Sequence, residues 1–159
     1  MGTEYFDNVK DQVGFCGIWC GSCAVGNGVL KELTERYADV VDRYGLKEWA
    51  SEGYDFSEFR KGLASIREVP VCSGCLKGGG RDNCEMKACA SDRKLKDCCG
   101  CNDFMTCENS EALRRMREGA RAAGILVKGR DVDRKNFVKK GISELKKKSP
   151  HCLLFCEAL

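Results

Sequence analysis

Apolar residues recur with the 3.6-residue period of an α-helix in four stretches of the chain, whereas residues 1–15 show little periodicity. The apolar positions of these stretches are Val29, Leu33, Val40 and Tyr44; Phe56, Phe59, Leu63 and Ile66; Leu113, Met116, Ala120 and Ala123; and Val138, Ile142 and Leu145. In the third stretch Arg114, Arg115, Arg117 and Arg121 fall on the opposite, outer face. The pattern predicts four amphipathic helices.

Capping and breaking residues give these helices their ends. The first cysteine cluster is expected to open the first helix, and Gly45 to end it. The other predicted ends are Asp55 or Ser57 and Pro70 for the second helix, Asn109 and Gly124 for the third, and Asp131 or Asp133 and Ser149–Pro150 for the fourth. Between the third and fourth helices, residues 125–127 are predicted to be a short extended piece.

Residues 71–107 follow a different pattern, because they contain eight cysteines, a run of three glycines and almost no aliphatic side chains. Fixing one residue costs roughly 1–2 kcal/mol of conformational entropy, and this segment has little apolar surface to offset that cost. We therefore expect metal or sulfur crosslinks to hold it.

The predicted fold class is mostly α, with a small cysteine-rich, metal-stabilised knot and about four flanking helices. We expect residues 1–159 to form a single cysteine-rich metal-binding domain whose C-terminal part, residues 109–148, is basic and helical. Residues 1–108 hold 14 Lys and Arg against 18 Asp and Glu, whereas residues 109–151 hold 13 against 5, a net charge of +8.

Cysteine is the unusual entry in the composition, with 13 residues out of 159, beside one His and two Pro. The chain has no long apolar run, and its first residues lack the features of a signal peptide, so a cytoplasmic protein with no membrane segment is predicted. A reducing cytosol disfavours disulfides and leaves metal binding or catalysis as the reason for many thiols. A disulfide scaffold is the alternative, known in some hyperthermophiles.

Pairs of cysteines two residues apart can both face one tetrahedral ion about 2.3 Å from each sulfur. Cys72 and Cys75 form such a knuckle, and Cys84 and Cys89 complete a credible four-thiolate set. Cys98 and Cys101 form a second knuckle, which Cys107 follows without a local fourth ligand. The first cluster, Cys16, Cys20 and Cys23, supplies that ligand or forms a site of its own.

Two blocks of the sequence resemble the cysteine-bearing blocks of the domain of unknown function 3795 family. They are residues 14–23, GFCGIWCGSC, and residues 72–108, from CSGC through CEMKACA to DCCGCNDFMTCE. The resemblance implies a metal site, which in that family is inferred to bind zinc, with the ligands Cys16, Cys20, Cys23, Cys72, Cys75, Cys84, Cys89, Cys98, Cys101 and Cys107. Cys99, Cys152 and Cys156 lie outside the family pattern, and Thr106 stands where the family often has Pro.

Zinc and an iron–sulfur cluster both accept four thiolates. Glycine-containing knuckles are typical of structural zinc sites, so zinc is the first prediction and a 4Fe–4S cluster the alternative. The Cys16-x3-Cys20-x2-Cys23 spacing is that of radical S-adenosylmethionine enzymes, but the chain lacks their barrel of alternating strands and helices.

Three functions remain open: a zinc-binding interaction module with a protein partner, an iron–sulfur protein for electron transfer or redox sensing, and a catalyst with an open metal position at the first cluster. Whether the protein is an enzyme stays undecided, because no acid–base constellation stands out. Nucleic-acid binding through basic residues 114–148 is considered but not favoured, because few aromatic residues interleave with the charges. His151 is expected to be a surface or capping residue.

Overall fold

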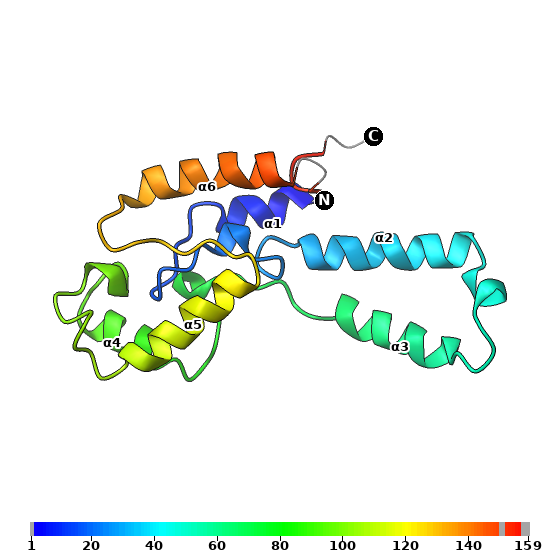
Figure 1. The fold of residues 1–159 in the computed structure, drawn as a ribbon, viewed down its shortest axis with the longest axis horizontal. Helices are drawn as coiled ribbons and strands as arrows, with labels where there is room; N and C mark the ends of the chain where they lie inside the picture. The colour runs from blue at the N-terminus through cyan, green and yellow to red at the C-terminus, as the bar shows by residue number, and fades with distance from the viewer. Residues whose placement is uncertain (1, 150–151, 157–159) are drawn as a thin grey trace.

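The structure is a computed structural model that describes residues 2–149 and 152–156, and it is mostly helical (Figure 1). The helices are α1 (Gly2–Val9), α2 (Val29–Arg43), α3 (Phe56–Arg67), α4 (Glu85–Asp92), α5 (Ser110–Ala122) and α6 (Arg134–Lys148). Turns of 3-10 helix cover Cys20–Ser22, Leu46–Trp49, Cys75–Lys77 and Cys98–Gly100. Within the described ranges the extended backbone forms only isolated bridges and no named strand. The predicted mostly-α class is confirmed, with six helices rather than four.

The four helices that the apolar period predicts are all present as α2, α3, α5 and α6. Asp55 and Asp133 cap α3 and α6, since their carboxylates accept hydrogen bonds of 2.9 Å from the backbone N–H groups of Glu58 and Asn136. Residues 125–127 are extended as predicted: Val127 bridges to Ile18, and the N–H of Trp19 donates to the carbonyl of Leu126 at 2.9 Å.

Two helices have no counterpart in the sequence prediction. Helices α1 and α4 span eight residues each, little more than two turns, so the apolar period has little length over which to show. The first cysteine cluster does not open a helix as expected. Its residues form bends and the Cys20–Ser22 turn, and α2 begins only at Val29.

The hydrophobic core is centred on Trp19, which is fully buried between α1 and α6. Its ring meets Phe6 of α1 edge to face at 6.5 Å, and its indole N–H donates to the carbonyl of Lys10 at 2.6 Å. On the α6 side, a Cβ added to Gly141 would lie 3.0 Å from the indole ring, so the helix packs directly against it. Because Trp19 stands between Cys16 and Cys20, the core fixes the first cysteine loop.

Helices α2 and α3 form a hairpin that projects from the rest of the molecule (Figure 1), and we call residues 29–67 the arm. No residue of α3 is buried, and Tyr44 and Trp49 are 69% and 82% exposed. At its base the N–H of Cys72 donates to the carbonyl of Val25 at 3.2 Å, so the chain leaves and returns at one place.

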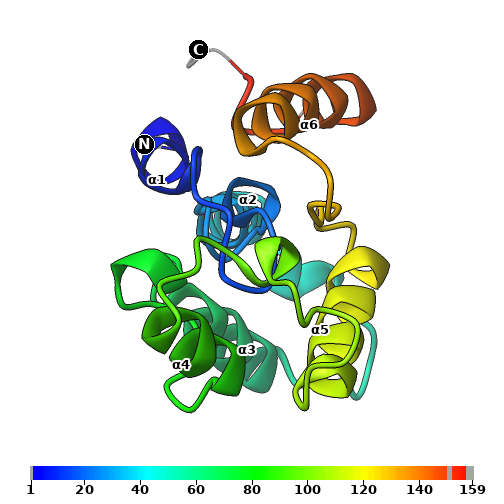
Figure 2. The ribbon, with the colours of Figure 1, turned by 90° about the vertical axis from the view of Figure 1, so that its left-hand side faces the viewer.

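Viewed from the opposite end to the arm, α4 and α5 lie on either side of the segment of residues 98–107 (Figure 2). No helix in the described ranges has the length and apolar character needed to cross a membrane.

Candidate metal centre

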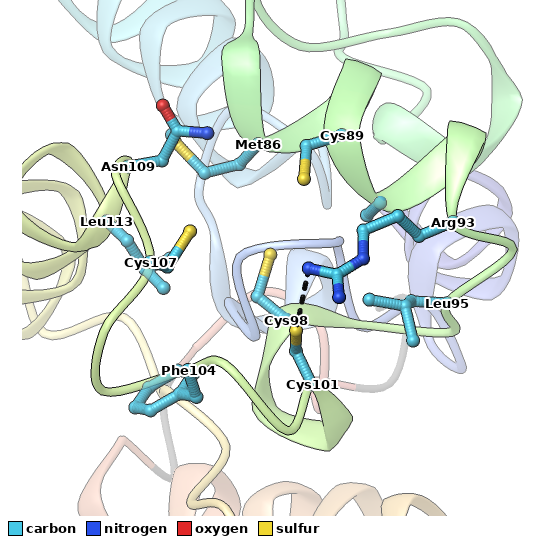
Figure 3. A pocket seen from close by; sticks show the side chains of 11 residues that line it. Met86, Cys89, Arg93, Leu95, Cys98, Cys101, Phe104, Cys107, Asn109 and Leu113 are labelled. Carbon is cyan, nitrogen blue, oxygen red and sulfur yellow. Dashed lines mark hydrogen bonds between the residues drawn. The ribbon is translucent and has the colours of Figure 1, made fainter.

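Four cysteines line a single cavity between α4, the Cys98–Gly100 turn and the loop before α5 (Figure 3). They are Cys89, Cys98, Cys101 and Cys107, and we call the space between them the four-cysteine cavity. Its volume is about 20 Å³, which is room for a body of about the size of one water molecule. The structure therefore brings together thiols that lie up to 18 residues apart in the sequence.

Local structure aims each of these side chains at the cavity. Cys89 lies on the face of α4 that also carries Met86 and Arg93, one helical turn before and after it. A tight turn, closed by a 3.1 Å hydrogen bond from the N–H of Cys101 to the carbonyl of Cys98, places those two cysteines side by side. Phe104 and Leu113 complete the apolar wall.

Burial governs the electrostatics of the four-cysteine cavity. Removal from water raises the pKa of the Cys98 thiol to about 12, and the neighbouring Cys16, Cys99, Cys89 and Cys107 add to that shift. The Cys98 thiol therefore stays protonated at neutral pH. A metal reverses this preference because its positive charge stabilises the thiolates, and its binding releases the protons.

A second set of cysteines, the N-terminal cysteine group, comprises Cys16, Cys20, Cys72 and Cys75. A Cβ built on Gly14 would lie 3.0 Å from the Sγ of Cys75 and 3.8 Å from that of Cys16, so both sulfurs border the same glycine. Burial, followed by the charges of Cys75, Cys72, Cys16 and Cys23, raises the pKa of Cys20 to about 12.

Backbone N–H groups point at the sulfurs of this group. The N–H of Phe15 donates to the Sγ of Cys75, and that of Gly74 donates to the Sγ of Cys72, both at 3.4 Å. Hydrogen bonds to sulfur stabilise the thiolate form and tune metal–thiolate sites. The donor set and its surroundings in both groups therefore suit a metal that binds through sulfur.

The structure groups the cysteines differently from the grouping that their spacing along the chain predicts. Cys89, which was expected to join Cys72, Cys75 and Cys84, instead supplies the fourth thiol beside Cys98, Cys101 and Cys107. Cys84 lines a separate pocket with Arg81 and Arg115, although its charge still affects the pKa of Cys16. The cue to this regrouping is α4, whose eight residues turn Cys89 away from Cys84.

The three cysteines outside the family pattern also lie outside both groups. Cys99 is buried, Cys152 packs against the Trp19 core and Cys156 is exposed. All thirteen cysteines are free thiols in the structure. His151 lies outside the described residues.

Arg117 was predicted on the outer face of its helix, and this prediction is wrong. Its side chain is 7% exposed and donates to the carbonyls of Cys16 and Lys128 at 2.9 and 2.7 Å, and to the Sγ of Cys99 at 3.1 Å. The guanidinium also lies over the ring of Phe104, 5.8 Å from its centroid. One side chain thus connects the loop of Cys16 with the Cys98–Gly100 turn.

Two further arginines of α5 pair with acids on the same helix. Arg114 forms salt bridges of 2.8 and 2.7 Å with Glu111 and Glu118, and Arg115 forms one of 2.8 Å with Glu111. Hydrogen bonds from the two arginines lower the pKa of Glu111 to about 2. The basic stripe on this helix is therefore largely neutralised, which weakens the case for contacts with nucleic-acid phosphates.

Gly17 leaves the space that Arg117 and Cys99 occupy. Its φ is +84°, and a Cβ there would lie 2.6 Å from the Nη1 of Arg117 and 2.9 Å from the Sγ of Cys99. Gly17→Ala is expected to destabilise the protein by about 2 kcal/mol or more, through backbone strain and displacement of Arg117. Urea unfolding would measure the loss.

Gly124→Ala is the matched control, because Gly124 also has a positive φ, +75°, but no atom lies within 4 Å of its added Cβ. It would show the backbone strain alone. Equal losses in the two variants would mean that the contact with Arg117 and Cys99 adds nothing.

Across residues 2–149 and 152–156, no three Cys, His, Asp or Glu side chains are placed so that together they could hold one metal ion. The four sulfurs thus line one space (Figure 3) but are not arranged as a ready-made site for one ion.

Comparison with known proteins places the chain in a family. Residues 12–112 match the model of a family described as "Protein of unknown function (DUF3795)". The matched range contains all the cysteines of the four-cysteine cavity and of the N-terminal cysteine group. No curated protein and no solved structure matches the chain. The match covers well over half of the sequence, and the chain belongs to the DUF3795 family.

Proposed function

We propose that the protein binds an iron–sulfur cluster in the four-cysteine cavity and works in electron transfer or redox sensing. The observation that carries the proposal is the ring of four thiols around one cavity, contributed by Cys89, Cys98, Cys101 and Cys107. Four cysteine thiolates are the usual ligands of a 4Fe–4S cluster.

The four-cysteine cavity would have to widen to accept a cluster, because its volume of about 20 Å³ has room for a body of about the size of one water molecule. A tetrahedral zinc about 2.3 Å from each sulfur requires sulfurs about 3.8 Å apart, and in the described ranges no three candidate ligands are placed to hold one ion. Either centre therefore requires the thiols to move on binding, and the choice of a cluster rests on the ring of four thiols and its apolar lining.

A cluster in this place would supply one-electron chemistry. The residues around it have separate tasks. Met86, Phe104 and Leu113 limit access of water, and burial of this kind shifts the potential of a metal centre. Arg93 places positive charge at the edge of the cavity.

A structural zinc site is the second candidate, and the N-terminal cysteine group favours it. The Cys72–Cys75 knuckle contains Gly74 with φ +81°, whose N–H donates to the Sγ of Cys72. Such N–H to sulfur contacts within a knuckle suit a tetrahedral four-thiolate zinc. In that case the protein is an interaction module with a protein partner, and its metal stabilises the fold.

Metal, sulfide and absorption analysis of anaerobically purified protein tests the proposal. We expect iron and acid-labile sulfide, with a broad visible absorption band that is lost in Cys89→Ser and kept in Cys156→Ser. Cys89 is the informative position because the spacing argument and the structure assign it to different groups. Zinc alone in a colourless protein would replace the first candidate by the second, and a metal-free folded protein would refute both.

A further inference from the structure

Arg93 lies at the C-terminal end of α4 and reaches over the edge of the four-cysteine cavity (Figure 3). Its Nη1 donates a hydrogen bond of 3.3 Å to the Sγ of Cys101. A guanidinium remains charged at any physiological pH, so this donor always presents positive charge to the sulfur. Neither the apolar period nor the cysteine spacing points to this residue.

Asp103 holds the guanidinium in this position. Its Oδ2 accepts a hydrogen bond of 2.6 Å from the Nη2 of Arg93, so one nitrogen binds the carboxylate while the other faces the sulfur. Asp103 follows Cys101 by two residues, and the same short loop therefore carries both acceptors. A lysine could not contact both groups with the same fixed geometry.

The charge of a four-thiolate centre gives this contact a function. Four thiolates around a 4Fe–4S core, or around one zinc ion, leave the centre with net negative charge. A charged N–H donor at one sulfur stabilises that negative charge, and it stabilises a reduced centre more than an oxidised one because reduction adds an electron.

We propose that Arg93, positioned by Asp103, stabilises a metal centre in the four-cysteine cavity against loss and raises its reduction potential. It does so through the hydrogen bond to the Sγ of Cys101. Arg93 is a positioning and tuning residue and not a ligand. The proposal rests on the proposed function, because it requires a metal centre in that cavity.

The test compares Arg93→Met, Arg93→Lys and Asp103→Asn with the wild type, each loaded anaerobically with iron and sulfide. Met keeps most of the apolar stem, Lys keeps the charge, and Asn releases the guanidinium without removing it. Arg60→Met is the matched control, because Arg60 forms a similarly exposed, non-local salt bridge of 3.0 Å with Asp42, on the arm.

Two quantities are measured at equal cluster content: the resistance of the cluster to an iron chelator and its midpoint reduction potential. For Arg93→Met we expect the affinity for the centre to fall about 10- to 100-fold and the potential to become more negative. Arg93→Lys and Asp103→Asn should give smaller changes in the same direction, and Arg60→Met none.

Arg93→Met with an unchanged reduction potential and unchanged chelator resistance would overturn the proposal. A variant that loses folding stability but keeps the wild-type potential would also overturn it, because Arg93 would then form only a structural salt bridge. If Arg93→Met does not fold, Arg93→Lys and Asp103→Asn decide on the same two measurements. Failure of the wild type itself to bind iron would refute the proposed function. A wild type that binds iron, with variants that behave like it, would refute only the role of Arg93.

Discussion

Cys98→Ser is expected to remove the metal from the four-cysteine cavity and to unfold the chain around it. Residues 71–107 bury few apolar side chains beyond Met86, Ala90 and the cysteines themselves. In zinc-finger peptides a structural metal contributes about 10–16 kcal/mol, which matches the about 5–15 kcal/mol that stabilises a typical domain. We therefore expect α4 and its flanking loops to depend on a metal centre more than on any hydrophobic contact.

Hydrogen exchange read by segment, together with metal analysis, would measure this effect. In Cys98→Ser we expect the amides of residues 85–109 to lose protection, while those of α6 keep most of theirs because α6 packs on the Trp19 core. Cys156→Ser is the control, since Cys156 is exposed and lies in neither cysteine group. Full protection and full metal content in Cys98→Ser would show that this cavity is not a metal site.

Trp19→Ala is the second substitution with a large expected effect, a loss of about 3–5 kcal/mol in the free energy of unfolding. The indole is fully buried, meets Phe6 and Gly141, and donates to the carbonyl of Lys10. Its removal leaves a cavity between α1 and α6 and frees the loop from Cys16 to Cys20. We therefore expect the metal content to fall together with the stability.

Urea unfolding followed by circular dichroism would measure the loss, with Trp49→Ala as the control. Trp49 is 82% exposed on the arm, so its replacement should change stability by no more than about 0.5 kcal/mol. Similar losses in both variants would contradict the assignment of Trp19 as the centre of the core.

The sequence predicted those helices that are long enough to repeat an apolar pattern. Helix α3 begins at the cap Asp55 and ends before Pro70, as its residues indicate. Helices α1 and α4 were not predicted, because their eight residues make little more than two turns and show little of an apolar period. Their stability comes from tertiary contacts, such as the burial of Phe6 and Met86, that no local pattern reveals.

The sequence singled out the cysteines that the structure groups, but their spacing along the chain did not predict the grouping. Spacing along the chain placed Cys89 with Cys72 and Cys75, whereas α4 carries it to Cys98. The burial of Arg117 was not predicted for a related reason. One of its hydrogen-bond acceptors, the carbonyl of Cys16, lies 101 residues away in the sequence. A helical wheel assigns an arginine to the solvent unless distant backbone groups are known to receive it.

The hydrogen bond between Val25 and Cys72 joins the two ends of the arm, so the arm is an insertion in an otherwise continuous structure. The entropic free-energy cost of closing such an insertion rises slowly with its length, by about 0.6 kcal/mol for each doubling. Adding residues to the arm or removing them, at any point after the first turn of α2, would therefore leave the positions of the sulfurs unchanged. The distance in sequence between the first cysteine loop and the later ones is free to vary, while the distances between the thiols in space are not.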